Sequence, residues 1–222
     1  MKHLKLILLV VLPLCGYAQS SSLAISVGRP WFADKDVNTQ NISTGLSFYH
    51  KLNESFACEA LYEYGYSNNM PVFLTDTGAL SEFMFSQTSS TILQASMWSM
   101  VQYQRLGVAM HHQFVNNQRF VFSCFLGSGY LVSESSVYVL EFFEYDPDSE
   151  QITDFDGRIE TQTIDKFYYN LGFQFHLNLS RAFFVGLNAS YLQIYDDYES
   201  LQSPVNAGNY NLSLLFGKRF DL

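Results

Sequence analysis

Histidine is the side chain most often used for acid–base chemistry near neutral pH, so its placement in the chain is informative. Beyond the first eighteen residues the histidines are His50, His111, His112 and His176. Neighbouring residues of a strand point to opposite faces, so His111 and His112 cannot chelate one metal ion together. The chain has no Gly-x-Ser-x-Gly, His-Glu-x-x-His or Cys-x-x-Cys motif. The sequence therefore assigns no catalytic, cofactor-binding or metal-ligating residue.

Acidic residues are concentrated in one run, ESSVYVLEFFEYDPDSEQITDFDGRIETQTID, which covers residues 134–165. It holds ten of the 21 acidic residues, and Arg158 is its one lysine or arginine. Hard cations such as calcium prefer several oxygen ligands, and the candidates here are Asp146, Asp148, Glu150, Asp154 and Asp156. Gln151 stands where the calcium-hand loop has glycine, so the calcium-hand spacing is absent. A solvated acidic connection is the simpler interpretation.

Eight segments of alternating polarity must position these groups. They cover residues 23–29, 42–52, 56–66, 102–114, 119–131, 167–178, 183–195 and 209–222. A period of two is typical of strands with one apolar face and one small or polar face. Apart from the first, each has about the nine to eleven residues that a tilted strand needs to cross a bilayer.

The connections between these segments alternate strictly between short and long. Three are short: Asn53-Glu54-Ser55, Asn116-Asn117-Gln118 and Leu179 to Ala182. Four are long: residues 31–41, 67–101, 132–166 and 196–208. Alternate connections of an up-and-down meander lie at the same end, so one end should carry only short turns. Within the third long connection, residues 138–145 and 152–163 could extend the strands outward, with Asp146-Pro147-Asp148 starting the turn.

Aromatic residues cluster where two membrane-interface belts would lie. Near the short turns or the C-terminus these are Phe56, Phe114, Phe120, Phe183 and Phe220. Near the long connections they are Tyr64, Tyr66, Tyr130, Tyr169, Tyr191 and Tyr210, all on the apolar face. Aromatic rings favour the level of the lipid headgroups, where one side is wet and the other apolar. The apolar face is therefore predicted to contact lipid.

The opposite face is predicted to line the lumen of a barrel. Its small residues are Ser43, Gly45, Ser47, Gly65, Gly107, Ala109, Ser123, Gly127, Gly129, Gly172, Gly186, Ser190 and Ser213. They would relieve crowding, since an eight-stranded barrel barely holds its own side chains. The same face carries Glu59, Glu63, Arg105, His111 and Arg219. We expect a Glu–Arg network that fills the lumen; a gated ion path is the alternative.

The N-terminus has the features of a secretory signal peptide. Lys2 and Lys5 precede an apolar run too short to span a membrane, and Gly16-Tyr17-Ala18 fits a cut before Gln19. The expected organisation is a signal peptide over residues 1–18 and one barrel domain over residues 19–222. Without Lys2 and Lys5 the chain has 10 basic against 21 acidic residues, a net charge of about −11 that disfavours nucleic-acid binding.

The cysteines that remain after such a cut are Cys58 and Cys124. They fall on non-neighbouring strands, and both fall on the apolar face. Two cysteines of an exported protein could pair, but this placement favours two free thiols.

The chain ends in GKRFDL, which resembles the signal by which outer-membrane barrels are handed to their assembly machinery. Gly217, Phe220 and Leu222 match its glycine, aromatic and final hydrophobic positions, whereas Leu215 departs from its polar position. The Ala18-Gln19 junction and the stretch GVAMHHQFVNNQRFVFSCFLGSGYLVS carry a further likeness. With the strand pattern, the chain resembles the small outer-membrane barrels of Bacteroidetes-type bacteria, the porin-family or OmpA-like transmembrane barrel.

The resemblance implies an all-β, eight-stranded antiparallel up-and-down barrel with short periplasmic turns and long extracellular loops. We expect a monomeric, non-enzymatic protein of the cell outer membrane with a structural or surface-interaction role. Its implied partners are outer-membrane lipid and lipopolysaccharide, the barrel assembly machinery and an unknown extracellular ligand, with no cofactor and no nucleic acid.

Three alternatives stay open at this point. The first is a narrow channel or small-solute binder that uses the charged lumen. The second is a barrel enzyme acting on lipid or peptide, against which the absence of a histidine near the long connections argues. Asp196-Asp197 could suit an aspartate protease of the barrel type, but those barrels are larger and have a histidine at the mouth. The third is a soluble secreted sandwich.

Overall fold

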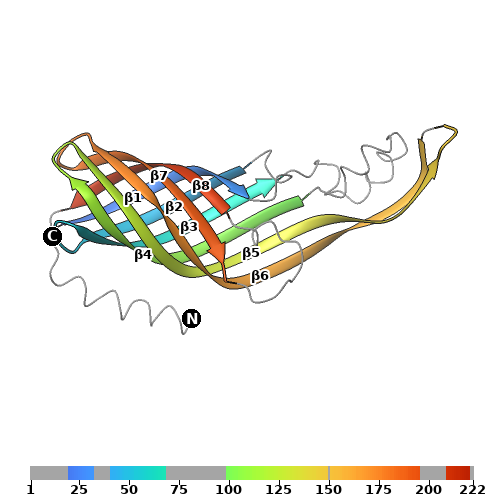
Figure 1. The fold of residues 1–222 in the computed structure, drawn as a ribbon, viewed down its shortest axis with the longest axis horizontal. Helices are drawn as coiled ribbons and strands as arrows, with labels where there is room; N and C mark the ends of the chain where they lie inside the picture. Colours follow the sequence, from blue (N-terminus) through green and yellow to red (C-terminus); the bar gives the residue numbers. More distant parts are fainter. Residues whose placement is uncertain (1–19, 33–40, 69–98, 150, 196–208, 221–222) are drawn as a thin grey trace.

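A computed structural model shows a closed antiparallel barrel in which every strand pairs with the next and β8 pairs with β1 (Figure 1). The structure describes residues 20–32, 41–68, 99–149, 151–195 and 209–220. The strands are β1 (Ser20–Phe32), β2 (Asn41–Lys51), β3 (Phe56–Asn68), β4 (Ser99–Asn116), β5 (Phe120–Asp146), β6 (Gln151–Asn178), β7 (Phe183–Ile194) and β8 (Asn209–Phe220). All eight predicted segments are confirmed as strands of one up-and-down barrel.

The alternation of each strand decides which residues enter the lumen. On β6, Asn170 and Gln174 are 4% and 3% exposed, whereas Leu171 and Phe173 between them are 46% and 53% exposed. Large apolar side chains of the other strands also lie on the outer surface, as the 65% exposure of Leu126 illustrates. This inverts the arrangement of a soluble protein and agrees with the outward apolar face of a membrane barrel.

The three short turns share one hydrogen-bonding pattern. In the β2–β3 turn the side-chain oxygen of Asn53 accepts hydrogen bonds from the backbone N–H groups of Ser55 and Phe56, each at 2.9 Å. Asn117 and Ser180 accept equivalent pairs in the β4–β5 and β6–β7 turns. The sequences are NESF, NQRF and SRAF, so a local Asx or Ser turn ends each time on a phenylalanine. We call this end of the barrel the short-turn end.

At the opposite end β5 and β6 continue beyond the barrel as a two-stranded ribbon (Figure 1). Their last pairs with neighbouring barrel strands are Ser99 with Val137 and Tyr168 with Ile194. Residues 138–146 and 151–159 pair only with one another among the described residues, and we call them the arm. The third long connection is thus a hairpin, as its two predicted strand extensions indicated.

The turn at the tip of the arm follows Asp146. One carboxylate oxygen of Asp146 accepts a hydrogen bond from the backbone N–H of Asp148 at 3.0 Å, and the other accepts the Ser149 hydroxyl at 2.7 Å. The Ser149 hydroxyl and the Asp148 N–H lower the pKa of the Asp146 carboxyl below its usual value. The predicted turn start is confirmed.

The outer surface carries aromatic rings at both ends of the barrel. At the short-turn end Phe183 stacks on Phe216, with ring centroids 6.0 Å apart, and the Lys218 ammonium lies 5.6 Å from the centre of the Phe220 ring. At the other end the rings of Tyr191 and Tyr210 lie 4.9 Å apart. The predicted placement of aromatic rings on the outer face near both ends is confirmed for these residues. No helix among the described residues is long and apolar enough to cross a membrane.

The two described cysteines are not joined by a disulfide. Cys58 on β3 and Cys124 on β5 are both partly exposed and form no disulfide, as predicted.

Several predictions fall outside the described residues: the signal peptide, the connections within 33–40, 69–98 and 196–208 with Asp196-Asp197, residue Glu150, and Leu222 of the terminal signal.

Candidate functional site

Four of the five ionisable residues predicted to face the lumen are buried there. Glu59 and Glu63 come from β3, and Arg105 and His111 come from β4; their exposures lie between 2% and 7%. The strand register places Glu63 directly opposite Arg105. Arg219, the fifth residue, lies near the end of β8 and does not join these four.

Glu63 and Arg105 form the first polar layer of the lumen. An Arg105 guanidinium nitrogen lies 2.8 Å from a Glu63 oxygen, in an ion pair whose side chains are 3% and 4% exposed. The Tyr103 hydroxyl donates to Glu63 at 2.9 Å, and the Asn211 amide of β8 donates to it at 3.1 Å. The guanidinium also lies 5.7 Å from the centre of the Tyr168 ring. The predicted Glu–Arg network is confirmed, and it links β3, β4, β6 and β8 across the lumen.

A second layer lies closer to the short-turn end. The Nε2 atom of His111 lies 2.8 Å from a Glu59 oxygen, and its Nδ1 atom lies 3.4 Å from the Ser123 hydroxyl. Beside it, the Gln174 amide donates to the Tyr49 hydroxyl at 2.6 Å. The line from Ser123 through His111 to Glu59 has the residue types of a hydrolytic triad, which the sequence motifs did not indicate. The long Ser–His contact and the 3% exposure of Ser123 argue for a structural role instead.

Large side chains fill much of the remaining lumen. Val101, Tyr103, Leu131, Tyr168, Leu192 and Ile194 form a buried cluster in which no member is more than 3% exposed. Inward glycines make room for the rings, since a Cβ at Gly65 would overlap Tyr103 and a Cβ at Gly217 would overlap Phe184. The expectation that small residues would relieve crowding is correct, but it missed the aromatic rings that take up the space. Around these side chains the interior is closely packed.

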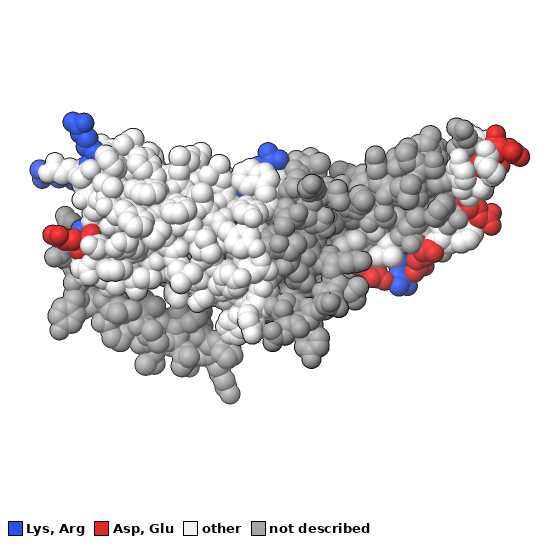
Figure 2. All heavy atoms as spheres, viewed as in Figure 1, with Lys and Arg blue, Asp and Glu red and all other residues white. Residues whose placement is uncertain are grey.

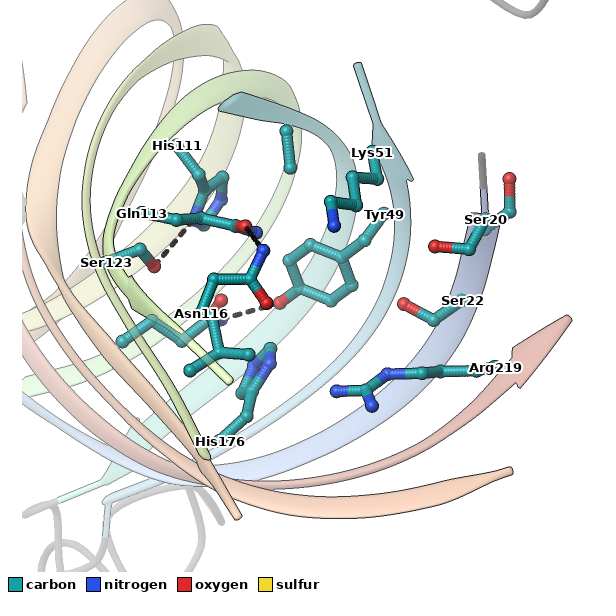
Figure 3. A pocket seen from close by; sticks show the side chains of 14 residues that line it. Ser20, Ser22, Tyr49, Lys51, His111, Gln113, Asn116, Ser123, His176 and Arg219 are labelled. Atoms are coloured by element: carbon teal, nitrogen blue, oxygen red, sulfur yellow. Dashed lines mark hydrogen bonds between the residues drawn. The ribbon is translucent and has the colours of Figure 1, made fainter. Parts of the chain in front are cut away.

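Below these layers, at the short-turn end, the lumen holds a cavity of about 150 Å³ (Figure 3). We call it the floor cavity. The residues that line it are Ser20, Ser21, Ser22, Tyr49, Lys51, Ala57, His111, Gln113, Asn116, Val121, Ser123, Gln174, His176 and Arg219. They come from every strand except β7, whose Phe184 ring lies 5.3 Å from the Arg219 guanidinium. Sequence reasoning missed this cavity because it depends on side chains from seven strands.

The histidines lie near the short turns, as predicted. His111 faces the lumen, whereas His112 packs against Phe56 on the outside with ring centroids 5.0 Å apart, so the two point to opposite faces. His50 Nδ1 lies 2.9 Å from the Ser21 hydroxyl of the neighbouring strand. His176 packs 4.4 Å from the Phe184 ring, and its Nε2 atom is buried without a partner among the described residues.

Acidic side chains are the more numerous charged groups along the arm. Figure 2 shows them there, and it shows basic side chains together with acidic ones at the opposite end. Arg158 of the arm lies 2.9 Å from Glu141 and 2.6 Å from Glu160, and this pairing raises the pKa of its guanidinium. Within the described residues no group of three or more acidic, histidine or cysteine side chains has a geometry that could hold a metal ion.

No protein-family model matches the chain, and no curated protein matches it in sequence. Solved structures do resemble it. A major outer membrane protein from Thermus thermophilus superposes with a TM-score of 0.53 at 10% identity, over 90% of this chain and 99% of that one. The attachment invasion locus protein Ail of Yersinia pestis gives a TM-score of 0.49 at 13% identity, over 91% and 99%. OprG from Pseudomonas aeruginosa gives 0.42 at 8%, over 94% and 99%.

These neighbours are outer-membrane β-barrel proteins, and at such low identity the likeness concerns the fold alone. The chain thus has the eight-stranded barrel fold of outer-membrane proteins.

Proposed function

We propose that this protein is a monomeric, non-enzymatic barrel of the outer membrane whose arm is a contact surface for partners outside the cell. The observation that carries the proposal is the arm itself, which continues two barrel strands past the last pairs with their neighbours. In membrane barrels the short turns lie on the periplasmic side and the long connections outside, so the arm would project from the cell. The resemblance to Bacteroidetes-type barrels remains part of this proposal.

The chemistry of the arm favours a basic partner. Residues 138–159, which are the arm and its turn, carry seven acidic residues against Arg158, and Arg158 already pairs with Glu141 and with Glu160 next to the arm. Phe142 and Tyr145 add apolar area to the arm, with exposures of 48% and 43%. Acidic side chains around exposed rings would attract a cationic surface by electrostatic steering and then bury apolar area against it.

The channel alternative receives little support from the lumen. An ion would have to pass the cluster around Tyr103 and Leu131 and the ion pair of Glu63 with Arg105, all of them 3% exposed or less.

The enzyme alternative would need an activated nucleophile within reach of lipid or peptide. Ser123, whose hydroxyl lies 3.4 Å from His111 of the pair with Glu59, lies in the lumen at the short-turn end.

Location and orientation are tested together on intact cells. We expect heat-modifiable migration on detergent gels, extraction by detergent only, and cleavage by an added protease within residues 134–165. A protein released by mild salt, or an arm cleaved only after the cells are opened, would overturn the proposed placement.

The contact role is tested with purified protein in nanodiscs of zwitterionic lipid and a fluorescent oligolysine peptide as probe. One variant replaces residues 139–158 by Asn-Gly, a two-residue hairpin turn after the pair of Tyr138 with Ile159. Another is the triple change Glu141→Gln, Glu144→Gln, Asp154→Asn. We expect both variants to lose most binding and the wild type to lose it at high salt. Unchanged binding by the variant without the arm would contradict the proposal.

The non-enzymatic part is tested by labelling with a fluorophosphonate, which reacts with activated serines. We expect no label on the folded protein. A label that is lost in Ser123→Ala would instead support the enzyme alternative.

A further inference from the structure

The floor cavity has the composition of an anion-binding site. Its volume of about 150 Å³ is roughly ten times the ~10–15 Å³ that one water molecule needs, so a small polyatomic ion fits. Above it the lumen is closed by Tyr49 with Gln174 and by His111 with Glu59. The cavity is therefore a dead-end pocket at the short-turn end of the barrel.

Two cationic side chains reach into this pocket. Figure 3 shows Lys51 of β2 and Arg219 of β8 pointing toward the space beside Tyr49. Among the described residues no carboxylate lines the cavity, and neither cation takes part in an ion pair. Two like charges that share a partly enclosed space repel one another, and an anion between them would relieve that repulsion.

Arg219 is held in place by two uncharged side chains. One of its terminal nitrogens donates to the Asn178 side chain at 2.6 Å, and its guanidinium lies over the Phe184 ring at 5.3 Å. These contacts fix the plane of the guanidinium while leaving several of its five N–H donors for a ligand. A fixed plane lowers the entropic cost of binding.

The neutral groups of the pocket add further hydrogen-bonding capacity. The hydroxyls of Ser20 and Ser22 face the cavity from β1 (Figure 3). His176 contributes a buried Nε2 atom that has no partner among the described residues and that can donate in one tautomer. A buried polar atom without a partner is unfavourable, so an acceptor placed here gains from that atom as well.

We propose that the floor cavity binds a small tetrahedral oxyanion of the phosphate class, which enters from the short-turn side. Lys51 and Arg219 supply the charge, Ser20, Ser22 and His176 supply further donors, and Phe184 supports the guanidinium. These donors approach the cavity from several directions that do not lie in one plane. Such an arrangement suits a tetrahedral anion better than a planar carboxylate. This site is independent of the arm and of its proposed partner.

The test uses the full protein folded in zwitterionic detergent, with inorganic phosphate as probe and NMR of the arginine side chains as readout. We expect a saturable shift of the Arg219 guanidinium signal that weakens as sodium chloride is raised. Arg219→Gln and Lys51→Gln should each raise the dissociation constant for phosphate, followed by calorimetry, by about tenfold or more.

Lys218→Gln is the matched control, because it removes one positive charge from the neighbouring position of the same strand. Lys218 packs on the rings of Phe183 and Phe220 outside the barrel, so this variant should bind phosphate within about twofold of the wild type. Heat-modifiable migration on a gel confirms that each variant is folded.

Three outcomes would overturn the proposal. They are no saturable shift at any phosphate concentration, equal losses in Lys218→Gln and Arg219→Gln, and tighter binding of acetate than of phosphate.

Discussion

At the residue scale, the lumen depends on two buried pairs, Glu63 with Arg105 and Glu59 with His111. Desolvation offsets much of the attraction within such pairs, so their presence says little about net stability. Removing one partner is different, because it leaves an uncompensated charge in a packed interior. The other described donors to Glu63, Tyr103 and Asn211, are uncharged. Arg105 is therefore the one cation among the described contacts of this carboxylate.

We therefore expect Arg105→Met to lower the free energy of unfolding by about 3–5 kcal/mol. Urea unfolding of the protein in detergent micelles, followed by tryptophan fluorescence, measures this. The double variant Glu63→Gln with Arg105→Met should recover most of the loss, because no charge is then left unpaired. A loss below about 1 kcal/mol in the single variant would contradict a buried, coupled pair.

At the element scale, the short turns and the close contacts between strands maintain the register. Each turn uses one side-chain oxygen to bind two backbone N–H groups. Neighbouring hairpins then bind one another, since the Asn178 amide donates to the carbonyl of Gln118 at 3.0 Å. The hydrogen bonds within each turn and those between neighbouring hairpins therefore favour the same strand register.

Asn117→Ala should remove the β4–β5 turn contacts and lower the free energy of unfolding by about 1 kcal/mol. Gln118→Ala is the control, because Gln118 is exposed and contributes only its carbonyl to a described hydrogen bond. The same urea titration compares the two variants. Equal effects would show that the Asn117 side chain does not organise the turn.

Gly217 is the position of β8 where the Phe184 ring of β7 lies over the backbone. The methyl groups of Gly217→Val should overlap that ring. We expect this variant to lower the free energy of unfolding by about 1–3 kcal/mol and to reduce the yield of folded barrel. Heat-modifiable migration gives the yield. Adding Phe184→Ala should restore part of the yield; if it does not, steric overlap is not the cause.

At the scale of the whole molecule, charge and packing give the barrel two different ends. The arm is acidic, and the cations around the opposite end include two that line the floor cavity (Figure 2). Between them, the layers around Glu63 and Glu59 and the apolar cluster close the lumen. Ions and small solutes therefore cannot diffuse through the barrel from one end to the other unless the core rearranges.

We accordingly expect no stable unitary conductance when the purified protein is inserted into planar bilayers. The variant without residues 139–158 should be equally silent, because the closure lies within the barrel. A defined conductance that disappears in Glu63→Ala or Arg105→Ala would instead establish the channel alternative.

The sequence alone determined where the eight strands lie, which face of each strand points out of the barrel and where the short turns fall. These properties are local. A period of two assigns Leu171 and Asn170 to opposite faces whatever the partner strand is, and the NESF and NQRF turns bind their own backbone. The same parity placed Glu59, Glu63, Arg105 and His111 in the lumen.

Only the tertiary structure decided which of these residues meet. The pairing of Glu63 with Arg105, the Ser123–His111–Glu59 line and the fit of Phe184 over Gly217 all depend on register between strands. Strand parity is insensitive to a register shift of two residues, which changes every cross-strand partner while leaving each side chain on its face. The floor cavity depends on seven strands at once. Arg219 lines this cavity and contacts Asn178 instead of joining the Glu63–Arg105 layer, because position along the barrel axis is set by pairing and not by periodicity.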